Sequence, residues 1–162
     1  MSRAPRRLLV AGVGNVLRSD DGFGPAVAAR LGHLPAGAEV IETGIGGVAL
    51  LQELMAGCDG LVLLDAIDRG EAPGTLFVIE PEVAEAEHVP DVHLVSPRRV
   101  LAMAKAMGVL PERVLMVACQ PADADSLGER LSPAVEPAVE LAVMRVGEII
   151  DAWLEEDVRA RL

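Results

Sequence analysis

The sequence predicts an α/β fold: a three-layer α/β/α domain around a mixed five-stranded, mostly parallel sheet with one antiparallel strand. Short apolar runs typical of buried strands alternate along the chain with segments whose apolar residues recur at helical spacing. The length of 162 residues and the hydrophobic content of 51% suit one core and leave little room for a second. We therefore expect a single domain spanning residues 1–162.

The first half of the chain contains three expected strands and two expected helices. The strands are expected at residues 7–13, 39–42 and 60–67, and the helices at 25–31 and 48–56. The run 60–67 (GLVLLDAI) is the clearest strand, and it ends on an aspartate. Gly32 and Pro35 end the first helix, and Gly57 ends the second.

The second half adds two strands and two helices. They are expected at residues 75–80 (strand), 96–108 (helix), 113–119 (strand) and from Ser132-Pro133 onward (helix). The connection before 75–80 is too short for a parallel crossover, so this strand should run antiparallel to its neighbour. Ser96 and Pro97 suit a helix start, and Pro137 can shift the start of the last helix by one turn. An apolar stripe in that helix is expected to face the core: Ala142, Val146, Ile149, Ile150 and Trp153.

Composition and charge exclude several classes of function. The formal charge is −11 and aromatic residues make up 2%, so the basic patches and stacking rings of nucleic-acid binders are missing. No apolar run approaches the roughly 20 residues of a membrane span. Cys58 and Cys119 are far apart and do not form a zinc or redox motif. We expect a cytoplasmic enzyme without nucleic-acid or membrane partners.

Polar residues follow the first three expected strands. They are Asn15, Asp20 and Asp21 after the first, Glu42 and Thr43 after the second, and Asp65 and Asp68 at the end of the third. In open α/β sheets, ligands bind beyond the carboxyl ends of the strands, where the winding direction reverses. If the first and third strands are neighbours, Asp21 and Asp65 converge in one crevice.

Two carboxylates in one crevice repel each other, so one takes up a proton or a cation binds between them. A histidine would complete a set of two oxygens and one nitrogen, which suits zinc, nickel or another first-row divalent ion. His93 is the best candidate because its loop leads directly into the helix at Ser96. The alternative is a loop histidine that is hydrogen-bonded to the backbone.

Two other kinds of chemistry have weaker signals. Gly12-Val13-Gly14 after a strand is similar to a dinucleotide fingerprint, but Leu17 occupies the third glycine position and the acidic pair would repel a pyrophosphate. Cys119 at the end of a strand could pair with His93 as a nucleophile, or it could be a buried structural thiol.

Four sequence blocks, in order, resemble the hydrogenase maturation peptidases. The blocks are Gly12–Leu17 followed by Asp20–Gly24, then Leu64–Ala66, His93–Ser96 and the polar loop entering Leu131–Pro133. Together they span nearly the whole chain, and the length agrees. One stretch departs from the pattern: Glu42-Thr43-Gly44-Ile45-Gly46-Gly47 stands where many members have an Asp-Gly-Gly-Thr-like sequence, which leaves the class of hydrogenase open.

The resemblance implies an endopeptidase that removes the C-terminal extension of a nickel–iron hydrogenase large-subunit precursor after nickel insertion. Carried over by position, Asp21, Asp65 and His93 are both the catalytic residues and the metal ligands, and Asp20 caps a loop or assists Asp21. We expect the nickel to be carried by the substrate. Open alternatives are another divalent metal that activates water, Asp21 or Asp65 as a general base, and a nickel-binding chaperone without proteolysis. A monomer is expected, with the precursor as its partner.

Overall fold

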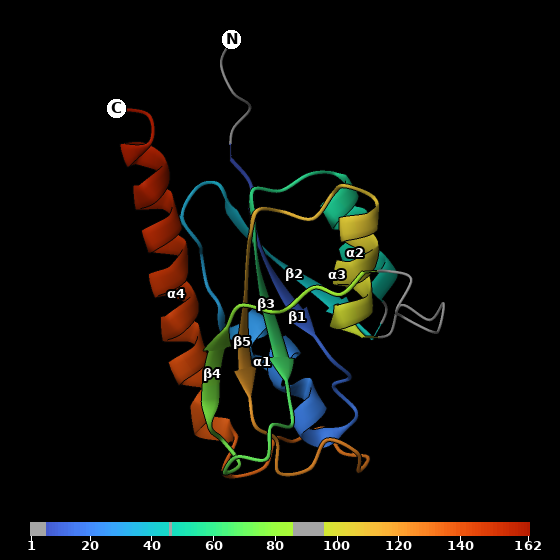
Figure 1. Cartoon of the computed structure of the whole chain (residues 1–162). Helices are drawn as coiled ribbons and strands as arrows, with labels where there is room; N and C mark the ends of the chain where they lie inside the picture. The colour runs from blue at the N-terminus through green and yellow to red at the C-terminus, as the bar shows by residue number, and fades with distance from the viewer. Residues whose placement is uncertain (1–5, 46, 86–95) are drawn as a thin grey trace.

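The fold is described from a computed structural model that covers residues 6–45, 47–85 and 96–162. Its elements alternate as the sequence predicts (Figure 1). The strands are β1 (Leu8–Val13), β2 (Ala38–Gly44), β3 (Gly60–Ala66), β4 (Leu76–Ile79) and β5 (Arg113–Cys119). The helices are the 3-10 turn η1 (Ser19–Gly22), α1 (Phe23–Arg30), α2 (Gly47–Met55), α3 (Pro97–Ala106) and α4 (Glu136–Arg159).

The five strands form one sheet in the order β2-β1-β3-β5-β4. β1 pairs in parallel with both β2 and β3, and β3 pairs in parallel with β5. β4 is an edge strand and runs antiparallel to β5. From β1 the chain first adds β2 on one side and then crosses to β3 on the other. The winding direction therefore reverses between β1 and β3, at the carboxyl ends that carry the predicted site.

Alternate residues of the strands supply two separate cores. One face of the sheet, including Leu8, Val10 and Val62, packs with α1 and α4. The opposite face, including Leu9 and Leu61, packs with α2 and α3. The helix pairs lie on opposite sides of the sheet, which gives three layers (Figure 1). Because strands buried on both faces need continuous apolar runs, β1 and β3 consist almost entirely of buried residues.

The predicted fold class is confirmed, and the differences are local. β4 is antiparallel as predicted, and the neighbour with which it pairs is β5. β2 continues through Glu42 and Thr43 to Gly44, which places these two residues within the strand. The last helix begins at Glu136, about one turn after Ser132-Pro133, as Pro137 in its first turn allows. Ser96 occupies the N-cap of α3 without a side-chain capping hydrogen bond.

The long helix α4 packs through the stripe that the sequence predicts. Ala142, Val146, Ile150 and Trp153 are buried, and Ile149 packs against the same core. The opposite side of the helix is exposed, so the helix is amphipathic. Among the described residues, no helix combines the length and the apolar character that membrane crossing requires.

Candidate functional site

The loop after β1 folds back so that η1 and the start of α1 lie on the carboxyl ends of β1 and β3. Two glycines make this close approach possible. A Cβ on Gly14, whose φ is +138°, would lie 1.9 Å from the carbonyl oxygen of Asp21. A Cβ on Gly24 would lie 2.2 Å from the carbonyl oxygen of Leu64. The glycine-rich signature thus brings Asp21 over the sheet. Close backbone packing explains why glycine occupies these positions, without a bound nucleotide.

Asp21 and Asp65 reach the same place from neighbouring strands. β1 and β3 are paired up to Gly12 and Leu64, and Asp65 is the next residue of β3. Asp21 lies in η1, which packs against β3. The backbone N–H of Asn15 donates to Asp21 Oδ2 at 2.7 Å, and that of Ala66 donates to Asp65 Oδ1 at 2.8 Å. The predicted convergence of the two carboxylates is therefore present in the structure.

The environment of Asp65 disfavours its charged form. The pKa of this carboxyl is raised to about 7, mainly by burial; the N–H of Ala66 partly opposes the rise and the nearby Asp21 carboxylate adds to it. Among the described residues, neither Asp21 nor Asp65 forms an ion pair with a lysine or arginine. Two carboxylates left without a cation are suited to take up a proton or a metal ion.

The third predicted residue, His93, lies outside the described residues, as does the rest of the stretch 86–95. Within the residues described, no group of three His, Cys, Asp or Glu side chains is arranged to hold a metal ion. The described part of the site is the Asp21–Asp65 pair. Two carboxylates supply oxygen donors for a first-row divalent ion, and a further donor would have to come from elsewhere.

Asp20 is fully buried and has a different role from its neighbour. Its Oδ2 accepts the N–H groups of Ala122 and Asp123, both at 2.9 Å, and the Ser132 hydroxyl at 2.7 Å. Its Oδ1 accepts the Ser132 N–H at 2.7 Å. Burial alone would raise the pKa of Asp20, but these donors together lower it below its ordinary value. Asp20 thus ties η1 to the loop between β5 and α4, as the expected loop cap.

The other polar residues singled out from the sequence do not join the carboxylate pair. Thr43 is buried, and its hydroxyl donates to the Gly12 carbonyl at 3.1 Å, which stabilises the β1–β2 edge. Glu42 is exposed. Asp68 is exposed and accepts the side-chain amide of Gln120 at 2.9 Å. Thr43 and Asp68 thus support the backbone around the site.

Sequence reasoning missed Gln120, a buried amide just after β5. Its oxygen accepts the N–H groups of Arg69 at 2.7 Å and Glu71 at 3.3 Å, and its nitrogen donates to Asp68. It thereby orders the loop between β3 and β4. Its position at the carboxyl end of a strand was the available signal, since that edge of a parallel sheet collects polar residues.

Cys119 is buried at the end of β5 and has no exposed surface. Burial raises the pKa of its thiol to about 11, and the charge of Asp20 contributes to the increase. A thiol with that pKa is almost entirely protonated at neutral pH and is a poor nucleophile. The structure therefore favours the structural reading of Cys119 over a Cys–His pair.

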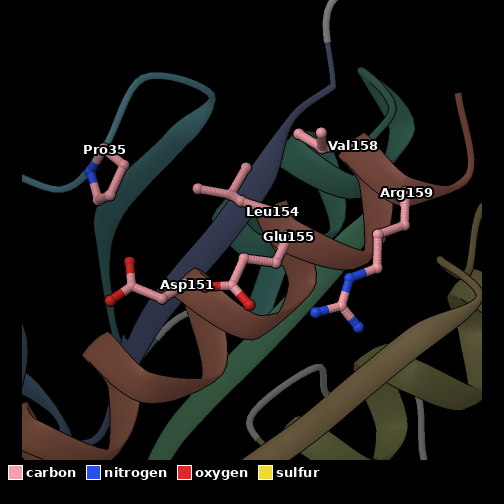
Figure 2. A pocket seen from close by; sticks show the side chains of 6 residues that line it. All are labelled: Pro35, Asp151, Leu154, Glu155, Val158 and Arg159. Atoms are coloured by element: carbon pink, nitrogen blue, oxygen red, sulfur yellow. The ribbon is translucent and has the colours of Figure 1, made fainter. Parts of the chain in front are cut away.

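A hollow at the other end of the molecule is remote from the carboxylates. It lies where the loop before β2 approaches the C-terminal turns of α4 (Figure 2). Its lining residues are Pro35, Asp151, Leu154, Glu155, Val158 and Arg159. This end of the sheet carries the amino ends of β1 and β3, so the hollow is not part of the candidate site (Figure 1).

Comparison with known proteins identifies the family of this chain. The profile of the hydrogenase maturation protease family matches residues 27–149. The hydrogenase expression/formation protein HupD of Rhodobacter capsulatus is 33% identical over 92% of this chain and 73% of its own length. The hydrogenase 2 maturation protease of Escherichia coli is 31% identical over 86% of this chain and 88% of its own length.

Solved structures give the same answer. The hydrogenase maturating endopeptidase HybD from E. coli superposes with a TM-score of 0.71 at 31% identity, over 86% of this chain and 89% of that one. The [NiFe] hydrogenase maturation protease HycI from Thermococcus kodakarensis also gives 0.71, at 25% identity, over 90% and 92% of the two chains. The profile match and the identity to full-length relatives show that this chain belongs to the hydrogenase maturation protease family and is a peptidase, a hydrolase.

Proposed function

We propose that this peptidase removes the C-terminal extension of a nickel–iron hydrogenase large-subunit precursor after nickel insertion, and that it recognises the bound nickel through Asp21, Asp65 and His93. The nickel belongs to the substrate. The coarse activity, processing of a hydrogenase large subunit, follows from the family. The metal-dependent recognition and its timing are the proposal.

The observation that carries the proposal is the convergence of Asp21 and Asp65 at the reversal point of the sheet. Each carboxylate accepts a backbone N–H through one oxygen, from Asn15 and Ala66. These bonds orient the carboxylates, while the second oxygens, Asp21 Oδ1 and Asp65 Oδ2, remain suited to an incoming cation. A cation carried by the substrate would relieve the mutual repulsion of the pair, which links binding to the presence of metal.

The protonation state of Asp65 would change when the metal-loaded precursor binds. With a pKa near 7 in the metal-free protein, Asp65 can hold a proton at neutral pH, whereas a cation beside it would favour the charged form. The nickel-loaded precursor would therefore bind with release of a proton from this site. A metal-free precursor would meet a pair that has already neutralised part of its charge.

The test compares processing of nickel-loaded and nickel-free precursor by the metal-free enzyme. We expect cleavage of the loaded precursor and little cleavage of the nickel-free one. His93→Ala should abolish processing of the loaded precursor while the circular-dichroism spectrum stays that of a folded protein. Equal cleavage rates for the two precursors would refute recognition through nickel. They would favour Asp21 or Asp65 as a general base acting on water.

Two alternatives have distinct outcomes. If a divalent ion held by the enzyme activates water, a chelator should stop processing and added zinc or nickel should restore it on a nickel-free precursor. If the protein is a nickel chaperone, a folded wild type would bind loaded precursor and leave it uncut; membership of a protease family favours cleavage. We also propose that the peptidase acts as a monomer, and light scattering of the purified chain tests this.

A further inference from the structure

Exposed apolar side chains gather beside the carboxylate pair. Of twelve large hydrophobic side chains that are exposed in the described residues, five lie in the loops that follow β1, β2 and β5 or in the first turn of α2, at the edge of the sheet that carries Asp21 and Asp65. They are Val16, Leu17, Ile45, Val48 and Leu127. Single exposed apolar residues are ordinary on a protein surface, but a group at one edge indicates a binding surface.

Three of these residues lie on two loops that are joined by hydrogen bonds. The Gly128 N–H donates to the Leu17 carbonyl at 2.9 Å, and the Ser19 N–H donates to the Gly128 carbonyl at 2.8 Å. The resulting parallel bridge pairs Arg18 with Gly128 and so sets Leu17 beside Leu127, one position earlier on each segment. Leu17 is 52% exposed and Leu127 is 85% exposed.

The joined loops hold these side chains in place. Ser19 adopts a positive φ of 50°, which is uncommon outside glycine, and its hydroxyl donates to the Ser126 carbonyl at 2.9 Å. Asp20, the next residue, binds Ala122, Asp123 and Ser132 on the second loop. The pair Leu17–Leu127 is therefore presented on an ordered backbone, so little conformational entropy would be lost on binding a partner.

We propose that Val16, Leu17 and Leu127, the apolar rim, bind an apolar stretch of the precursor chain beside the bond that is cut, and that this contact determines substrate specificity. The inference rests on the proposed function. The rim shares its loop with Asp21, four residues beyond Leu17, so a chain bound at the carboxylates would lie next to the rim. The protein is strongly acidic, with a formal charge of −11, whereas the rim is apolar. The net charge of the protein disfavours a strongly acidic partner, and the exposed leucines would accommodate an apolar segment.

The test replaces leucine by glutamine, which is similar in size and removes the apolar surface. The variants are Leu17→Gln, Leu127→Gln and the double variant, with Leu141→Gln as the matched control. Leu141 is 53% exposed, on the outer side of α4. We expect each rim variant to raise KM for the nickel-loaded precursor about 10-fold, with kcat within about 2-fold. The conservative variant Leu127→Met keeps an apolar side chain and should retain the wild-type KM. The control Leu141→Gln should also match wild type.

Direct binding of the precursor is measured by calorimetry in parallel, so that two failures can be told apart. The rim variants should bind more weakly, with a less negative heat-capacity change, because less apolar surface is buried. Wild-type KM and wild-type binding in the double variant would overturn the apolar rim. A wild type that binds but does not cut the precursor would overturn the proposed function, and the binding series would still decide on the rim. Self-association that disappears in the double variant would identify a second copy as the occupant and overturn the proposal.

Discussion

Asp20 and Asp65 are two acidic residues at the same edge of the sheet with opposite environments. Asp20 is fully buried, yet four hydrogen-bond donors keep its pKa below the ordinary value. Asp65 has the N–H of Ala66 as its donor, and burial raises its pKa to about 7. The number of donors, and not burial alone, determines which carboxyl is charged.

The difference separates a structural carboxylate, Asp20, from one that we propose to be functional, Asp65. Asp20 uses both oxygens to join two loops that are about one hundred residues apart in sequence, which leaves little capacity for a ligand. Asp65 is incompletely satisfied beside Asp21, a condition that costs stability and is retained where chemistry needs it. The adjacent residues of the acidic pair therefore have different environments: Asp20 joins two loops, and Asp21 lies beside Asp65.

The largest effect is expected from removing a charge at the functional carboxylate. Asp65→Asn should lower the processing rate of loaded precursor by at least about 100-fold, because under the proposed function the pair loses an oxygen that would contact the nickel of the substrate. The folded state should persist, as measured by circular dichroism. The matched control is Glu71→Gln, which removes an exposed charge on the neighbouring loop and should process at the wild-type rate. Wild-type processing by Asp65→Asn would contradict the functional role proposed for Asp65.

The same substitution at Asp20 should act on stability. In Asp20→Asn, either amide orientation sets an NH₂ against backbone N–H donors and leaves buried groups unsatisfied. We expect a loss of about 2–4 kcal/mol in the free energy of unfolding, measured by urea denaturation. Asp125→Asn, an exposed charge in the partner loop, should change it by less than about 0.5 kcal/mol. A stable Asp20→Asn protein would show that the hydrogen bonds contribute little.

The pH dependence of stability should also distinguish the two sites. The pKa of Asp65 rises from an ordinary 3.8 to about 7 on folding. Its neutral form favours the folded state, so its contribution is complete below pH 4 and is lost as pH rises to 7. In metal-free protein, Asp65→Asn should match wild type near pH 4 and be more stable at pH 8, by on the order of 4 kcal/mol. Thermal unfolding across this range gives the measurement, and a constant difference would contradict the assignment.

Asp20 should show the opposite trend. Its pKa is lowered on folding, so its stabilising contribution is present above its ordinary pKa and is lost as the solution becomes more acidic. The penalty of Asp20→Asn should therefore shrink below about pH 4, while that variant stays less stable than wild type at neutral pH. The two variants together should show opposite pH dependences of the stability difference from wild type.

The sequence predicts the fold because strands buried on both faces need continuous apolar runs, and β1, β3 and β5 have them. It also predicts the Asp21–Asp65 pair, because the reversal of winding between β1 and β3 brings together the ends of two strands that can be identified in the sequence.

What the sequence could not predict depends on contacts between distant segments. The expected loop cap at Asp20 is confirmed. Its partners Ala122, Asp123 and Ser132 could not be identified from the sequence, because they lie about one hundred residues away, in the loop after β5. The role of Gln120 depends in the same way on a loop about fifty residues earlier. Local spacing predicts elements and strand ends. The donors that fix a carboxylate arise from tertiary packing.

The smallest effect is expected at Cys119, a reactive side-chain type at the same edge of the sheet. Its carbonyl accepts the Ile67 N–H at 2.9 Å, so its backbone lies beside the end of β3. Its thiol, with a pKa near 11, is influenced by Asp20 and belongs with the structural group. Cys119→Ala should cost about 1 kcal/mol of stability through a small cavity and leave the processing rate unchanged. If processing were lost while the variant remained folded, the active chemistry would include the thiol, and the division between Asp20 and Asp65 would no longer describe this edge.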